Sequence, residues 1–146
     1  MQRKHQTGFT MLELMVVLVI LGILATMVVP NVFGNREQAE QQKVVSDLTA
    51  LENAMEMYRL DNGIYPTTEQ GVEALVNEPT IDPRPRNYRD GGYIRRLPRD
   101  PWGNEYQLMS PGEHGRYDIF TMGPDGRAGT DDDIGTWNMH DLDVED

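Results

Sequence analysis

The chain has 146 residues, and its 24 acidic side chains outnumber its 13 basic ones to give a formal net charge of -11. Acidic surfaces repel nucleic acid and anionic lipid, so the composition argues against both as partners of the soluble part. The sequence contains no cysteine, which excludes a disulfide, a thiolate nucleophile and a Cys-ligated metal. Beyond an N-terminal apolar segment, the length leaves room for one soluble domain of about 110 residues.

The N-terminal part of the chain is a short basic leader followed by a long apolar run. From Phe9 to Val29 only Glu13 is charged. A helix of that length reaches about 32 Å, which is enough to cross a hydrocarbon core about 30 Å thick. The basic residues of the leader should keep it on the cytoplasmic side. We therefore expect a single-pass membrane segment.

The lone acid of this segment, Glu13, lies one helical turn into the apolar run. A carboxylate at that depth costs about 2.5 to 3.5 kcal/mol, so it marks a functional site and needs a partner. A cut between Gly8 and Phe9 would create an ammonium group four residues before Glu13, on the same face of a helix. Two alternatives are an ordinary secretory signal peptide and a plain anchor helix. Residues 30–33 offer no small-x-small cleavage site for the first, and the second explains neither Gly8 nor Glu13.

A second helical pattern follows the apolar run. Pro30 should kink or end the first helical segment, because proline removes a backbone donor and clashes with the preceding turn. From Arg36 to Leu60 the helix is polar with one apolar stripe, formed by Val44, Leu48, Leu51, Met55 and Tyr58. We expect one helix of about fifty residues, ended by Asp61-Asn62-Gly63 and Pro66. Its stripe is too short for a convincing coiled-coil seam and should pack on the domain's own sheet.

The remainder of the chain predicts short elements. Thr67 or Thr68 can cap a short helix over 69–76, and 79–92 has the composition of a surface loop. Tyr93-Ile94 is expected to be a short extended piece. Alternating apolar and polar residues predict an antiparallel meander with strands over 105–109, 116–121 and near 134–137. The fold class is therefore α+β, with a long N-terminal helix, membrane-spanning in its first half, packed on a small antiparallel sheet.

An acidic loop over 122–134 is the second strong pattern. Four aspartates fall within nine residues, and Gly126 and Gly129 let the backbone turn its carbonyls inward. Oxygen ligands on a tight loop suit calcium, at the weak affinity of about 0.1 to 1 mM typical of extracellular modules. The spacing is not that of an EF-hand, and a solvated acidic turn is the alternative. No paired acid and base, nucleophile context or histidine ligand spacing is present, so we expect no enzyme activity.

Two sets of motifs resemble known families. Lys4, Gly8-Phe9-Thr10 and Glu13 ahead of a long apolar helix resemble the class III signal of type IV pilins and pseudopilins. Across nearly the whole chain, successive motifs resemble those of the major pseudopilins of type II secretion systems: Asp61–Gly71, Gly91–Ile94, Leu97–Asn104 and Tyr117–Trp137. The resemblance implies a type IV pilin-like fold whose C-terminal loop binds calcium. Side chains of Asp125, Asp132 and Asp133 and carbonyls of Met122 and Arg127 would then be the ligands, although which of Asp131, Asp132 and Asp133 face the ion stays open.

The resemblance also implies how the chain is processed. A prepilin peptidase would remove the leader, 1–8, by cutting after Gly8, and would methylate the amine of Phe9. Residues 9–30 would be the transmembrane and filament-core segment in the inner membrane, and 31–146 the periplasmic domain.

In the filament that the resemblance implies, Glu13 would pair with the Phe9 ammonium of a neighbouring subunit. Gly22 and Pro30 would bracket a section of helix that can unwind on assembly, although Gly22 can also simply be tolerated in a membrane helix.

The function implied by the resemblance is structural. The chain would be the major subunit of a homo-oligomeric helical filament that drives export of folded proteins across the outer membrane. Its partners would be minor pseudopilins, the prepilin peptidase and the inner-membrane assembly platform. The alternatives are a type IV pilin for adhesion or motility, and a membrane-tethered calcium-binding module or enzyme. The missing C-terminal cysteine pair and the acidic loop count against the pilin.

Overall fold

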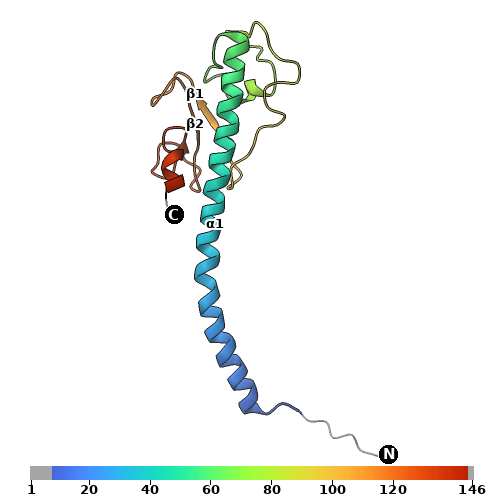
Figure 1. The fold of residues 1–146 in the computed structure, drawn as a ribbon, viewed down its shortest axis with the longest axis vertical. Coiled ribbons are helices and arrows are strands. Elements are labelled where there is room, and N and C mark those ends of the chain that lie inside the picture. Colours follow the sequence, from blue (N-terminus) through green and yellow to red (C-terminus); the bar gives the residue numbers. More distant parts are fainter. Residues whose placement is uncertain (1–7, 145–146) are drawn as a thin grey trace, which may run out of the picture. The chain divides into compact units, whose positions relative to one another are not determined.

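The computed structural model of the chain describes the backbone of residues 8–144 and the side chains of 8–26 and 34–142 (Figure 1). The chain divides into two compact units, Met1–Ala39 and Glu40–Asp146. The elements in chain order are the helix α1 (Met11–Asn62), the 3-10 helix η1 (Val72–Leu75), the strands β1 (Gln107–Met109), β2 (Asp118–Thr121) and β3 (Ile134–Gly135), and the 3-10 helix η2 (Met139–Val144).

Helix α1 has the expected length of about fifty residues, with 52 in all. It does not end at Pro30, so that alternative is wrong: one missing donor does not stop the helix where the neighbouring turns keep their own hydrogen bonds. It ends as predicted at Gly63, whose φ of 76° is left-handed and whose amide donates to the carbonyl oxygen of Arg59 at 2.7 Å.

The apolar stripe of α1 is the centre of the second unit. Its five predicted members, Val44, Leu48, Leu51, Met55 and Tyr58, are all fully buried. They share one core with Leu75 of η1, Leu108 of β1, Ile119 of β2 and Met139 of η2. Figure 1 shows β1 and β2 beside this part of α1. The predicted packing of the stripe on the sheet is therefore confirmed. Full burial of each such side chain contributes about 1.5 to 3 kcal/mol to the stability of the fold.

The sheet is the predicted antiparallel meander, in the order β1-β2-β3. Leu108 pairs with Ile119, and Phe120 pairs with Gly135. The strands are shorter than predicted. Glu105 forms an isolated bridge with Arg99 and does not extend β1.

Strand β3 stops at Gly135 because the ring of Trp137 folds back over that glycine. A Cβ at Gly135 would lie 2.2 Å from the ring.

Two local predictions are wrong. The helix expected over 69–76 is reduced to η1, because Gly71 has a φ of 62° that a continuous helix excludes. The Gln70 amide donates to the Thr67 hydroxyl at 3.3 Å and the Thr67 amide donates to the Gln70 side chain at 3.0 Å, but these bonds close the turn before η1, whose N-cap is Gly71 without a side-chain cap. Tyr93 and Ile94 form a bend and not an extended piece, because both of their amides turn to the carbonyl oxygen of Leu75.

Candidate functional site

The start of α1 places the predicted cleavage and assembly residues. Gly8 and Phe9 precede the helix, and the side chain of Phe9 is 79% exposed. Thr10 caps the helix by accepting the amide of Glu13 at 3.2 Å, so Glu13 occupies the first turn, where the helix dipole favours a carboxylate. In the uncut chain Phe9 lies just before the first helical residue, Met11. Within the described residues, no basic side chain pairs with Glu13.

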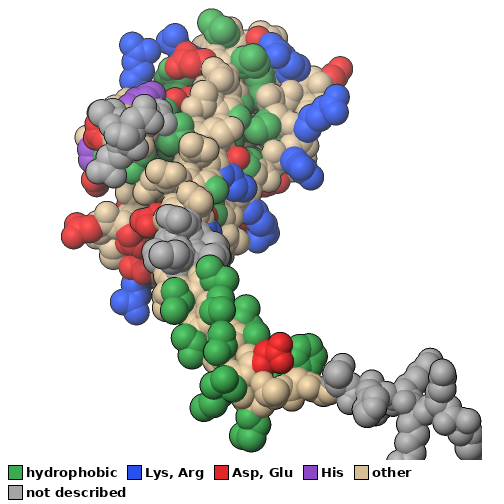
Figure 2. Space-filling view, turned by 60° about the horizontal axis from the view of Figure 1, so that its bottom comes forward, with side chains coloured by type: hydrophobic (Ala, Val, Ile, Leu, Met, Phe, Trp, Pro, Cys, Tyr) green, Lys and Arg blue, Asp and Glu red, His purple; other side chains and the backbone are tan. Residues whose placement is uncertain are grey.

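The first part of α1 exposes its apolar side chains. Large hydrophobic residues from Met11 to Leu24 are all about half exposed or more, and Leu18 reaches 68%. Figure 2 shows apolar side chains across this segment, with an acidic one among them. A search of the described residues found no helix long and apolar enough to span a membrane. Gly22 is helical with open space around its Cα, and the side chain of Pro30 lies outside the described ones.

The acidic loop between β2 and β3 is closed by three left-handed glycines. Gly123, Gly126 and Gly129 have φ values of 63°, 68° and 85°. At Gly123 an added Cβ would lie 2.5 Å from the carbonyl oxygen of Asp132, so the two ends of the loop touch where only glycine fits.

Two of the predicted metal ligands are linked across this loop. The amide of Asp125 donates to the carboxylate of Asp132 at 3.2 Å, and Asp125 itself accepts the amide of Arg127 at 2.8 Å. The hydrogen bond from the Thr130 hydroxyl is the main cause that holds the pKa of Asp132 below its ordinary value of 3.8, against partial desolvation. The loop therefore keeps this carboxylate ionised and ready for a cation.

The third predicted ligand, Asp133, carries a polar atom without a partner. Its side chain is 9% exposed, its Oδ2 accepts the amide of Gly129 at 2.6 Å, and its buried Oδ1 has no hydrogen bond. A buried carboxylate oxygen without a partner is costly, and a cation would satisfy it. In the described part of the chain, however, no three acidic or histidine side chains converge on one metal position. The fit to a hard cation therefore rests on the oxygen chemistry of the donors and on the partnerless Oδ1 of Asp133. Asp131 is exposed to solvent.

The two predicted carbonyl ligands also lie in this loop. Arg127 is exposed, and its carbonyl oxygen accepts the hydroxyl of Thr130 at 3.0 Å. Met122 is half-buried directly after β2. Both are close to the linked carboxylates along the chain.

A surface hollow of about 570 Å³ adjoins the acidic loop, and sequence reasoning missed it. The imidazole of His114 stacks on Trp137 with 4.4 Å between ring centroids, and Phe120 contacts the same indole. Asp118 is buried beside them, and its Oδ2 accepts the backbone amides of Glu113 and His114 and the ring Nδ1–H of His114. His114, Asp118 and Phe120 lie within one stretch of seven residues, but Trp137 comes from beyond β3, so the stacked pair does not form a local motif.

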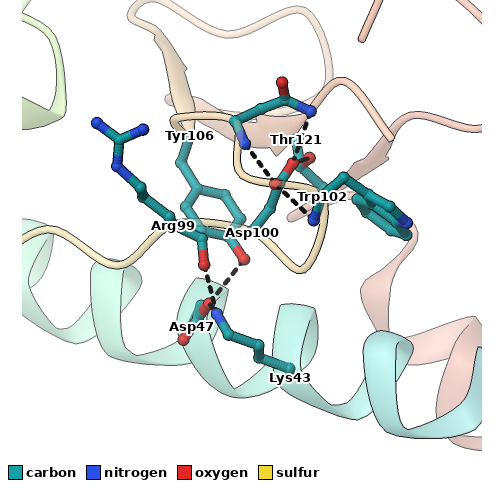
Figure 3. A network of polar contacts seen from close by, with 8 residues as sticks. Lys43, Asp47, Arg99, Asp100, Trp102, Tyr106 and Thr121 are labelled. Atoms are coloured by element: carbon teal, nitrogen blue, oxygen red, sulfur yellow. Dashed lines mark hydrogen bonds and ion pairs between the residues drawn. The ribbon is translucent and has the colours of Figure 1, made fainter. Parts of the chain in front are cut away.

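The Asp100–Asn104 turn is flanked by two contacts with α1 (Figure 3). Lys43 donates to the carbonyl oxygen of Arg99, and the hydroxyl of Tyr106 donates to Asp47 at 2.9 Å. Burial is the main cause that raises the pKa of Tyr106 well above its ordinary value, helped by the Asp47 carboxylate. Tyr106 therefore remains a hydrogen-bond donor at neutral pH.

Comparison with known proteins identifies close relatives. The family described as Type II secretion system (T2SS), protein G matches residues 31–137, and the prokaryotic N-terminal methylation motif matches residues 3–29. The type II secretion system core protein G of Aeromonas hydrophila is 69% identical over 142 residues, which cover 97% of this chain and 99% of that protein. The core protein G of Vibrio cholerae is 64% identical, with coverages of 95% and 97%. The crystal structure of the major pseudopilin from the type 2 secretion system of enterohaemorrhagic Escherichia coli matches with a TM-score of 0.71 and 62% identity, over 76% of this chain and 97% of that one.

The Asp118 cluster predicts a specific acid sensitivity. Burial raises the pKa of Asp118, but the hydrogen bonds from His114 and Glu113 outweigh it and hold the pKa below 3.8. A depressed pKa stabilises the fold above the unfolded-state value, and this contribution is lost as the pH falls through the folded-state value. Asp118→Asn should therefore flatten the fall in the free energy of unfolding below about pH 4, measured by urea denaturation. The exposed Asp90→Asn is the control, and an equally steep fall in both variants would contradict the assignment.

Proposed function

Because the chain belongs to the type II secretion system protein G family, the major pseudopilins, and is a structural subunit of that system, we propose that it assembles into a filament through the first part of α1. One observation carries the proposal, the contrast between the two parts of this helix. Beyond Glu40 the apolar stripe is fully buried by the chain's own sheet, whereas the apolar side chains from Met11 to Leu24 are exposed. A continuous exposed apolar surface of this kind marks a site of contact with a membrane or with another protein chain.

The cover is proposed to change during assembly. Before assembly, residues 9–30 lie in the inner membrane as a single pass, with the leader on the cytoplasmic side and 31–146 in the periplasm. After assembly, the same side chains pack against helices of other copies. Each buried Leu or Val contributes about 1.5 to 3 kcal/mol relative to an exposed one, so either cover stabilises the segment strongly. The filament would then drive export of folded proteins across the outer membrane.

The cleavage proposal is supported by the backbone before α1. Gly8 and Phe9 lie outside the helix and are exposed, so the peptide bond between them is open to a prepilin peptidase. Cutting there leaves a free amine on Phe9, which the same enzyme methylates. That amine is a cation close to the depth of Glu13, which lacks a basic partner among the described residues. A pair between Phe9 of one copy and Glu13 of the next would offset both charges and set the axial register.

The other partners follow from the family. Minor pseudopilins and the inner-membrane assembly platform are the proposed partners within the secretion-system complex. Gly22 and Pro30 bracket a section of α1 that is helical here and is proposed to unwind in the filament. The open space around Gly22 leaves this change unobstructed within the described residues.

Calcium is the proposed ion of the acidic loop. Side chains of Asp125, Asp132 and Asp133 would hold it, with carbonyl oxygens of Met122 and Arg127 completing the shell. The support is the partnerless buried oxygen of Asp133 and a donor set made only of oxygen. Bound calcium would neutralise the carboxylates and tie the two ends of the loop together, in a domain that has no disulfide.

Removing the intramembrane acid tests the charge pair. Glu13→Ala should leave cleavage largely intact but abolish filaments, because the Phe9 ammonium of the neighbouring copy would be buried without a partner. Processing is read by immunoblot and filaments by electron microscopy of cells. Glu37→Ala, an exposed acid further along α1, is the matched control and should assemble normally. Normal filaments from Glu13→Ala would refute the pair.

Calcium binding is tested by thermal melts of the full chain in detergent. With calcium about 100-fold above its Kd, linkage should raise the free energy of unfolding by about 2.7 kcal/mol relative to chelator. Asp125→Ala should lose most of this gain, whereas the exposed Asp141→Ala, outside the loop, should keep it. If Asp125→Ala lowers the Tm equally with calcium and with chelator, the loop is not the calcium site.

A further inference from the structure

A buried carboxylate stands next to the acidic loop without being one of its members. The side chain of Asp100 is 4% exposed, and in the described structure it has no basic partner. Its Oδ1 accepts the amides of Trp102 at 3.0 Å and Asn104 at 2.6 Å. Its Oδ2 accepts the side-chain amide of Asn104 at 3.3 Å and the hydroxyl of Thr121 (Figure 3). Four neutral donors thus bind this buried carboxylate. Hydrogen bonds to a carboxylate are strong, so they fix the orientation of the Thr121 hydroxyl and the Asn104 amide.

Two of these donors also hold Gly123, the first glycine of the acidic loop. The Gly123 amide donates to the Thr121 hydroxyl at 3.2 Å. The side-chain amide of Asn104 donates to the Gly123 carbonyl oxygen at 3.3 Å. Gly123 is therefore clamped at both its donor and its acceptor by partners of Asp100.

The clamp fixes a proposed calcium ligand. Met122 and Gly123 share a trans peptide, in which C=O and N–H point in opposite directions. Because the Gly123 N–H is held on Thr121, the Met122 carbonyl is turned away from that hydroxyl. Gly123 also lies against Asp132, where an added Cβ would be 2.6 Å from a carboxylate oxygen. Placing Gly123 therefore places both a carbonyl and a carboxylate of the proposed site.

We propose that Asp100 is a positioning residue of the calcium site, acting on Met122 and Asp132 through Thr121 and Asn104. The inference rests on the calcium binding proposed above and assigns no contact between Asp100 and the ion. On the other side of the same turn, Arg99 and Tyr106 contact Lys43 and Asp47 of α1, and these contacts are separate from the two that hold Gly123. The affinity of the loop for calcium then depends on Asp100, Asn104 and Thr121, which lie outside the loop.

The test compares two substitutions at the buried Thr121. Thr121→Val keeps the shape but removes the hydroxyl, whereas Thr121→Ser keeps the hydroxyl. Loss of an outer-shell partner typically weakens metal binding about 10- to 100-fold, so calcium titration calorimetry of the full chain in detergent should show that rise in Kd for Thr121→Val. Thr121→Ser should stay within about threefold of the unchanged chain.

A second buried hydroxyl of the same network supplies the control. Tyr106→Phe removes the hydrogen bond to Asp47 but does not touch Gly123. It should lower the Tm in chelator and leave the calcium Kd unchanged. A merely structural role of Thr121 predicts the same behaviour for Thr121→Val, so an unchanged Kd there would overturn the inference. An equal rise in Kd for Tyr106→Phe would also overturn it.

Asn104→Ala provides an independent arm if Thr121→Val does not fold. It removes the bond to the Gly123 carbonyl, places no apolar group in the core and should also raise the Kd about tenfold or more. An unchanged Kd in a folded Asn104→Ala chain would contradict the clamp. If the unchanged chain itself takes up no calcium, the proposed calcium site fails, and that result is distinct from a failure of the positioning role.

Discussion

Burial of one apolar stripe on α1 is the interaction on which the second unit depends. The three strands are very short, and a sheet of that size is not stable alone. It becomes stable because Leu108 and Ile119 pack into the same core as the helix, together with side chains from η1 and η2. The polar contacts of Lys43 with Arg99 and of Asp47 with Tyr106 tie the segment before β1 to the helix. The helix, the sheet and the 3-10 helices therefore depend on one shared core for their stability.

The same helix carries a second apolar surface that the described part of the chain does not cover. This difference separates a subunit of an assembly from a self-contained domain. The head can be acidic and soluble because its own core is complete, while the first part of α1 remains available for lipid or for other copies. In the proposed filament, the large negative charge would keep the heads from associating with one another and leave the helix as the contact between copies.

Periodic and local features could be predicted from the sequence. The stripe follows a 3.6-residue period, Gly63 follows from helix-end chemistry, and the meander follows from alternation. Contacts between distant segments could not: Met139 of η2 enters the core, Tyr93 turns to Leu75, and His114 stacks on Trp137. No local sequence pattern encodes these contacts, because each one forms only when the tertiary fold brings two distant segments together.

The acidic loop lies between these cases. Its aspartates and glycines mark it in the sequence, but its closure depends on Gly123 meeting Asp132, and its support comes from Asp100, which reads locally as a turn residue.

The first part of α1 is proposed to leave the membrane after cleavage and to pack against other copies. Mass analysis of the N-terminal peptide from sheared filaments reads the chain in its assembled state. We expect a peptide that begins at Phe9 with a methylated amine. A peptide that keeps Met1, or one that begins near Pro30, would refute cleavage and assembly through this helix.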